Sequence, residues 1–138
     1  MGISRGPSIG FPLEAAAGDA LEAYADTESS TASGTPVKKK EIRIARAGAY
    51  RIKYDMKIDV SGGGNTVVAN IYKNGVACGT QHGRDTDTYS TYTEDISGFA
   101  IGDLIQLYVW RLVASTGSSR NFRIYCVNPI ETDVTLDT

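Results

Sequence analysis

A chain of 138 residues with 41% apolar side chains is long enough for one domain with its own core, and its fifteen glycines and eight tyrosines favour sheet and turns. Two cysteines exclude a disulfide framework or a zinc cluster, and no apolar run reaches the roughly 18 residues that a membrane helix needs. The net charge of −2 is uneven, because residues 37–127 hold 13 basic and 8 acidic residues between acidic ends; this predicts either plain solubility or acidic arms that dock on a basic body.

Residues 1–36 are predicted to form an attachment arm and a linker. The stretch SIGFPLEAAAGDAL carries the apolar side chains Ile9, Phe11, Leu13 and Leu21, yet it is interrupted by glycine and proline, which argues against a signal peptide. The following DTESSTASGTP has the composition of a linker. We expect the apolar arm to be buried on another subunit or on a larger particle. The alternative is an arm that folds back across its own sheet.

The body begins with two strands of period two. In AYRIKYDMKIDV every second residue from Tyr50 to Val60 is apolar, and the residues between them are charged, which predicts a half-buried strand. The preceding VKKKEIRIA alternates more weakly and places Ile42 and Ile44 inward. A Gly-Gly-Gly-Asn loop follows the second strand.

Asn74 and Gly75 predict a type I′ turn that joins two antiparallel strands, roughly residues 66–73 and 76–82, because both residues tolerate positive φ. The segment TYSTYTEDI predicts a further strand. The next strand, GDLIQLYVWRLV, is apolar on both faces. It is therefore either a central strand covered on both sides or a strand that meets a partner subunit through Leu107, Val109 and Trp110.

The segment RNFRIYCVN closes the body at residue 127, and an acidic tail follows at residues 128–138. Seven or eight strands at regular spacing, with turn signals between them, predict an all-β fold. We expect an antiparallel β-sandwich of jelly-roll type, formed by residues 37–127.

The residues that could carry chemistry do not form a catalytic pattern. His82 is the only histidine, and no serine or cysteine motif accompanies it. Cys78 is expected on the same strand, about 13 Å away between Cα atoms, which is beyond hydrogen-bond reach. We expect both Cys78 and Cys126 to be core residues, and the sequence leaves open whether they form a disulfide. Asp85 and Asp87 lack the third carboxylate of a calcium site, so we expect no enzyme, no metal and no cofactor.

The basic stretch between residues 38 and 57 holds 8 of the 14 lysines and arginines. Nucleic-acid binding would combine such a patch with exposed aromatic rings. Tyr50 and Tyr54 instead alternate with Arg51 and Lys53, so we expect the two rings to point into the core. The pattern therefore favours a solvated or protein-docking face over a nucleic-acid site.

Three segments, VKKKEIRIARAGAYRIKYDMK, IYKNGVACGT and YTEDISGFAIGDLIQLYVW, resemble the small β-sandwich domains of tailed bacteriophages. Such domains occur in tail-fibre and adhesin tips and in head-associated proteins. The IYKNGV hairpin and the GDLIQLY strand are also similar to C1q/TNF-like jelly rolls. The resemblance covers roughly residues 36–126. It implies a virion surface part without catalytic residues that assembles as an oligomer, often a trimer.

We therefore expect a bacteriophage decoration or accessory protein of the virion, assembled in the host cytoplasm. Its partners would be copies of itself, most simply in a trimer, and the major capsid or tail protein. The alternative is a receptor- or glycan-binding tail-fibre or adhesin module. A cellular carbohydrate-binding module or C1q/TNF-like signal ranks lower, because we see no signal peptide. The glycan alternative assigns sugar contacts to exposed loop residues, namely Arg84, Asp85, Tyr89, Arg120 and Asn121.

Overall fold

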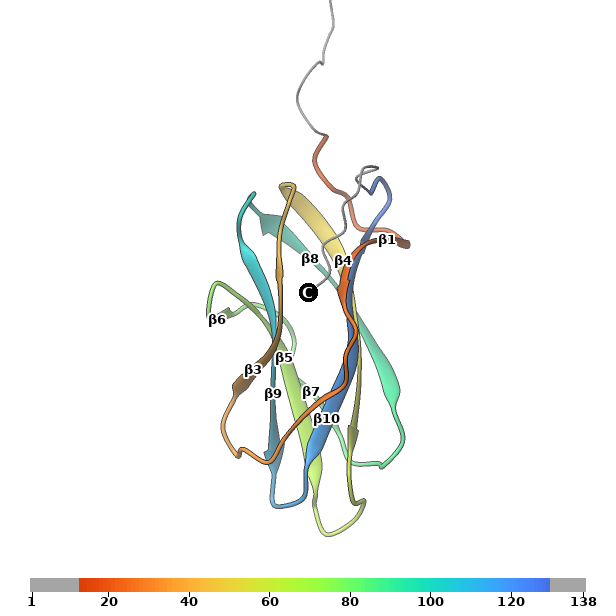
Figure 1. Cartoon of the computed structure of the whole chain (residues 1–138), viewed down its shortest axis with the longest axis vertical. Helices are drawn as coiled ribbons and strands as arrows, with labels where there is room; N and C mark the ends of the chain where they lie inside the picture. Colours follow the sequence, from red (N-terminus) through yellow and green to blue (C-terminus); the bar gives the residue numbers. More distant parts are fainter. Residues whose placement is uncertain (1–12, 130–138) are drawn as a thin grey trace, which may run out of the picture.

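The computed structural model describes residues 13–129, which form ten strands and no helix. The strands build two antiparallel sheets that pack face to face (Figure 1), so the expected all-β antiparallel sandwich is confirmed. Sheet A contains β1 (Ala20–Ala25), β2 (Ser29–Thr31), β4 (Gly48–Ile58), β8 (Ser90–Phe99) and β10 (Gly117–Cys126). Sheet B contains β3 (Val37–Arg43), β5 (Thr66–Lys73), β6 (Val76–Ala77), β7 (His82–Arg84) and β9 (Leu104–Leu112).

Strands that are distant in the sequence lie side by side in both sheets. Sheet A has the order β1-β10-β4-β8, and β2 pairs with the same strand, β10, as β1 does. Sheet B has the order β3-β9-β5-β6, and β7 also pairs with β5. The first strands of the chain are thus hydrogen-bonded to its last strands.

The core lies between the sheets and follows the predicted alternation. The alternate apolar residues of β4 from Tyr50 to Ile58 are each at most 1% exposed, and Ile42 and Ile44 are also buried. Val60, expected on the same face, is 55% exposed because β4 ends at Ile58, before it. The prediction was therefore correct along the strand and failed only where the strand ends.

Strand β9 lies between β3 and β5 in sheet B, and only one of its two apolar faces packs against sheet A. Ile105, Leu107 and Val109 point into the core and are at most 1% exposed. Leu107 and Val109 are therefore covered by the chain's own sheet A and cannot contact a partner subunit. Trp110 has the opposite parity and lies on the outer face of sheet B, where it is partly exposed.

The predicted hairpin is present. Asn74 and Gly75 have φ values of 51° and 84°, and Lys73 pairs with Val76 across the turn. The return strand is shorter than expected: β6 ends at Ala77. Beyond Ala77 the backbone N–H groups of Cys78 and Gly79 both donate to the Ile71 carbonyl of β5, and regular pairing with β5 resumes at β7.

Part of the segment expected to lie outside the body belongs to the sandwich. Strand β1 pairs with β10 from Ala20 opposite Cys126 to Ala25 opposite Phe122, and β2 occupies the expected linker. The two strands satisfy the main-chain groups along the free edge of β10. Ala25 is buried at 3% exposure, and its small size makes its contribution to a hydrophobic pattern hard to recognise. Ile9 and Phe11 lie outside the described residues.

Candidate functional site

The first and the last described residues meet at one end of the sandwich (Figure 1). The backbone N–H of Val127 donates to the carbonyl of Ala16 at 2.8 Å, and the Asn128 amide donates to the carbonyl of Glu14 at 3.1 Å. We call residues 13–19 the strap and this end the terminal end. Both chain segments that lie outside the described residues are joined to the sandwich here.

The strap lies against the start of β4. Ala15 donates from its backbone N–H to the carbonyl of Ala47 at 2.8 Å, and its own carbonyl accepts from Ala49 at 2.9 Å. Gly48, with φ of 138°, lies between these two contacts. A Cβ atom on Gly48 would lie 2.1 Å from the Ala15 carbonyl oxygen, so only glycine allows this close approach.

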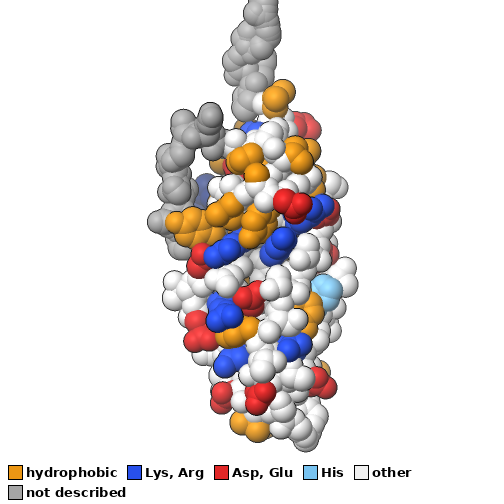
Figure 2. Space-filling view, turned by 90° about the vertical axis from the view of Figure 1, so that its right-hand side faces the viewer, with side chains coloured by type: hydrophobic (Ala, Val, Ile, Leu, Met, Phe, Trp, Pro, Cys, Tyr) orange, Lys and Arg blue, Asp and Glu red, His pale blue; other side chains and the backbone are white. Residues whose placement is uncertain are grey.

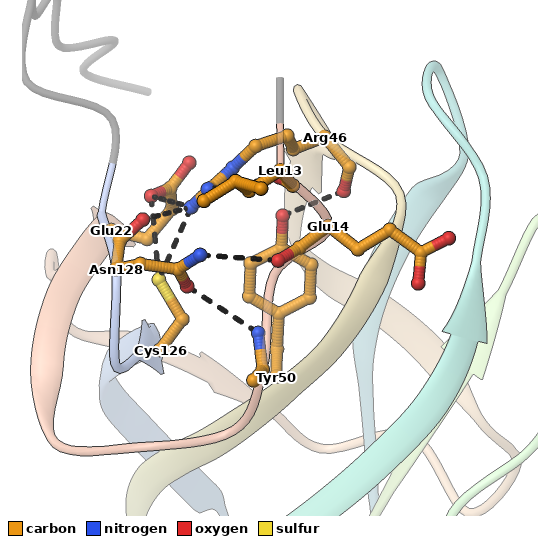
Figure 3. Close-up of polar contacts among 8 residues, drawn as sticks. Leu13, Glu14, Glu22, Arg46, Tyr50, Cys126 and Asn128 are labelled. Atoms are coloured by element: carbon orange, nitrogen blue, oxygen red, sulfur yellow. Dashed lines mark hydrogen bonds and ion pairs between the residues drawn. The ribbon is translucent and has the colours of Figure 1, made fainter. Parts of the chain in front are cut away.

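A buried arginine holds three segments together beneath the strap (Figure 3). The Arg46 side chain, 6% exposed, lies 3.4 Å from the equally buried Glu22 carboxylate of β1. Its guanidinium also donates to the Leu13 carbonyl at 3.2 Å, to the Asn128 carbonyl, and to the Cys126 sulfur at 3.5 Å. We call these residues the Arg46 clamp. It connects the strap, β1 and the end of β10.

The groups around the clamp are held in their uncharged forms, apart from the ion pair itself. Tyr50 donates its hydroxyl to the Arg46 carbonyl at 2.7 Å, and burial, followed by the charge of Glu22, raises the pKa of Tyr50 to about 12. Burial also raises the pKa of the Cys126 thiol. A thiol with a raised pKa is a weak nucleophile. The geometry therefore supports a structural role for the Arg46 clamp, which is to hold these chain segments together.

Exposed apolar side chains gather at the terminal end. Leu13, Leu21 and Val127 are 74%, 44% and 62% exposed. Figure 2 shows hydrophobic side chains in the upper part of the face, above rows of basic and acidic ones. Two of the predicted arm anchors, Leu13 and Leu21, are thus available for contact. A groove of about 410 Å³ lies between the strap, the start of β4 and the end of β8, and it is lined by Glu14, Ala15, Ala16, Ala17, Gly48, Ala49, Ser97, Gly98 and Phe99.

The acidic N-terminal residues dock on the basic body of their own chain. Asp19 lies 2.7 Å from the guanidinium of Arg51, and Asp26 forms a two-pronged pair with Arg123 at 2.8 and 2.9 Å. Arg51 also pairs with Asp95 at 2.8 Å. These ion pairs agree with the charge segregation in the sequence. They connect the acidic segment to basic side chains of sheet A.

The residues assigned to glycan binding are only partly brought together. Arg120 lies over the Tyr89 ring at 3.9 Å from the ring centroid, and Lys57 lies at 5.2 Å. The Tyr89 hydroxyl donates to the Glu28 carboxylate. Burial and then Glu28 raise the pKa of Tyr89. The ring is therefore engaged by cations of its own chain.

The other assigned residues are satisfied internally or lie apart. Asn121 donates to the Asp55 carboxylate at 3.0 Å, within the shift in register between β10 and β4. Arg84 donates to the Thr88 carbonyl at 2.7 Å. Asp85 is exposed. Most of the hydrogen-bonding groups of these residues therefore already have a partner within the folded chain.

The two cysteines are both free, but they differ in their surroundings. Cys126 is buried as expected, whereas Cys78 is exposed. Cys78 does not share a strand with His82, because it lies between β6 and β7. The His82 ring packs 5.1 Å from the Tyr92 ring. No group of three or more His, Cys, Asp and Glu side chains between residues 13 and 129 is placed to hold a metal ion.

Sequence reasoning missed Arg46 and Glu22. Arg46 stands in the turn-like ARAGA and Glu22 in a weak pattern, so neither carries a local signal of burial.

Comparison with known proteins finds no matching family model and no matching curated protein. Within the described residues, no helix has the length and apolarity needed to cross a bilayer.

Proposed function

We propose that the chain is a non-enzymatic accessory protein of a bacteriophage virion, attached through its terminal end to a capsid or tail protein. The observation that carries the proposal is the terminal end itself. Both described chain ends meet there, and the exposed Leu13, Leu21 and Val127 surround them. An apolar patch at the point where both outer segments attach favours anchoring, since such patches mark interaction sites.

The strand order supports a jelly-roll assignment within this proposal. Four nested antiparallel pairs run through the chain: β1 with β10, β3 with β9, β4 with β8, and β5 with β6. Winding four nested strand pairs into two sheets produces a jelly roll, an architecture common in viral capsid proteins. The resemblance of the body segments to phage sandwich domains points to the same class.

Particle incorporation tests the attachment. A Leu13→Asp/Leu21→Asp variant should be depleted from purified particles while its melting temperature stays close to that of the native chain. A matched control, Val60→Asp/Leu112→Asp, places the same charges at residues that are 55% and 48% exposed outside the terminal end, and it should incorporate normally. Absence of the native chain from purified particles would contradict the proposal.

We further propose that the protein assembles as an oligomer, most simply a trimer. The support is the resemblance to trimeric virion domains together with the exposed apolar terminal end; Leu107 and Val109 no longer contribute, because they are buried in the core. Sedimentation of the full chain should give a mass near three times 14.8 kDa at micromolar concentration. A mass of one chain over a broad concentration range would refute the trimer.

A further inference from the structure

The outer face of sheet B carries a row of aromatic side chains. Tyr108 and Trp110 are two positions apart on β9, with the parity opposite to that of the buried Leu107, so both point outward. Tyr72 of the neighbouring β5 stacks on Tyr108, with ring centroids 3.8 Å apart and an interplanar angle of 17°. Beside this pair, Trp110 is paired across the sheet with Val68. The three side chains lie on the same face of sheet B, and we call them the aromatic row.

A hydrogen-bonded polar line runs next to the aromatic row. The Gln106 amide, 5% exposed, donates to Glu41 Oε1 at 3.0 Å and accepts from the backbone of Gly75 at 2.8 Å. Lys38 Nζ donates to the same Glu41 oxygen at 2.7 Å. These contacts fix the carboxylate in place. They leave Glu41 Oε2 without a hydrogen-bond partner in the described part of the chain.

The aromatic row also has unused polar groups. The Trp110 indole N–H and the hydroxyls of Tyr72 and Tyr108 have no hydrogen-bond partner between residues 13 and 129. Tyr89 on sheet A differs, because cations cover its ring and Glu28 binds its hydroxyl. The outer face of sheet B thus combines apolar rings with free donors and one oriented acceptor.

We propose that the aromatic row and Glu41 bind an uncharged carbohydrate chain. A sugar ring has an apolar face of C–H groups and a rim of hydroxyls, so it requires both aromatic contact and mixed hydrogen bonding. Phosphate-bearing polymers fit less well, because Lys38 is already paired with Glu41 and nucleic-acid grooves need several free cations. Tyr108 and Trp110 are separated by about 7 Å along the strand, which spans more than one sugar ring. The ligand is therefore an oligosaccharide.

The chain contains one tryptophan, so its fluorescence reports directly on this face. The full chain is titrated with cellohexaose, laminarihexaose, maltohexaose and chitohexaose, and it is screened on an array of bacterial surface glycans. We expect a saturable shift of Trp110 emission with at least one probe. Tyr108→Ala should weaken binding by about tenfold or more, and Glu41→Gln should weaken it less. Tyr125→Ala, an outward tyrosine of sheet A, is the matched control and should bind normally.

Several outcomes would overturn the proposal. One is the absence of any glycan binding on the array together with no Trp110 shift at millimolar hexasaccharide. Another is binding that is unchanged in both folded variants, Tyr108→Ala and Glu41→Gln. A Trp110 shift with oligo-dT alone would assign the face to nucleic acid. A shift that depends only on protein concentration would assign it to a second copy of the chain.

Discussion

At the terminal end, segments more than a hundred residues apart meet around one buried arginine, whereas the opposite end is formed by two exposed loops that are hydrogen-bonded both within themselves and to each other. This opposite, loop end comprises residues 59–65 and 112–116. Asn65 donates from its side chain to the Val60 carbonyl at 3.1 Å and from its backbone to Gly62 at 3.2 Å. The loop end depends on turn geometry and exposed hydrogen bonds, whereas the terminal end depends on a buried ion pair, so substitutions at the two ends should have different consequences.

The largest effect is expected from Arg46→Ala. It removes the buried cation opposite Glu22, and breaking a buried ion pair costs about 3–5 kcal/mol. Urea unfolding measures the loss. The Cys126 thiol, buried next to the guanidinium, should become accessible to a thiol reagent, and Cys78, which is exposed in the native fold, serves as the reference. In the control Arg123→Ala the lost pair with Asp26 is 37% exposed on the arginine side and 35% on the aspartate side, and the cost should be about 1 kcal/mol or less. Equal losses of unfolding free energy in the two variants would contradict a special role for the clamp.

Gly48→Ala should cost about 2–3 kcal/mol, because the methyl group meets the Ala15 carbonyl oxygen and φ is 138°. The strap has to move, and Cys126 should again become more reactive. Gly98→Ala is the matched control, since its φ is +86° but no atom lies within 4 Å of the added Cβ. Gly98→Ala should lose stability through backbone strain alone, and its Cys126 should still react slowly with the thiol reagent. A strap that stays closed in Gly48→Ala would contradict the close approach.

Gly75→Val should cost about 1 kcal/mol or more, because a β-branched residue is forced to the φ of 84° that the hairpin turn requires. The effect is local, so Cys126 should remain protected, because this turn belongs to neither the strap nor the clamp. Thermal unfolding measures the loss. Gly75→Asn, which tolerates the left-handed region, should lose clearly less. If both variants have the same melting temperature as the native chain, the turn does not constrain the fold.

The smallest effect has the opposite sign and lies at the loop end. Val113 has φ of 70°, a conformation that is strained for a β-branched residue, and it is 64% exposed. Val113→Asn should therefore stabilise the chain by about 0.5–1 kcal/mol. Ser115→Asn, at φ of 73°, should gain less because serine is not β-branched. A lower melting temperature for Val113→Asn would show that its side chain has a packing role that outweighs the strain.

Much of the fold could be predicted because its signals are local. The alternation from Tyr50 to Ile58 and the Asn74-Gly75 turn each arise within a dozen residues, and both appear as predicted. The candidate site could be predicted only in outline. Leu13 and Leu21 are exposed at the terminal end, as an anchoring role requires, whereas the glycan assignment to Tyr89 meets a ring that is already occupied.

The sequence by itself determined the strand periodicity, the hairpin and the contrast between acidic ends and a basic body, because these depend on side-chain parity, turn geometry and composition. Only the tertiary structure decided which apolar face of β9 is buried, since both faces fit a covered strand. It also decided that residues 20–31 complete sheet A, that Arg46 pairs with Glu22, and that Tyr108 stacks on Tyr72. These outcomes depend on which distant segments come together, and a one-dimensional pattern holds no signal for a partner 24 or 82 residues away.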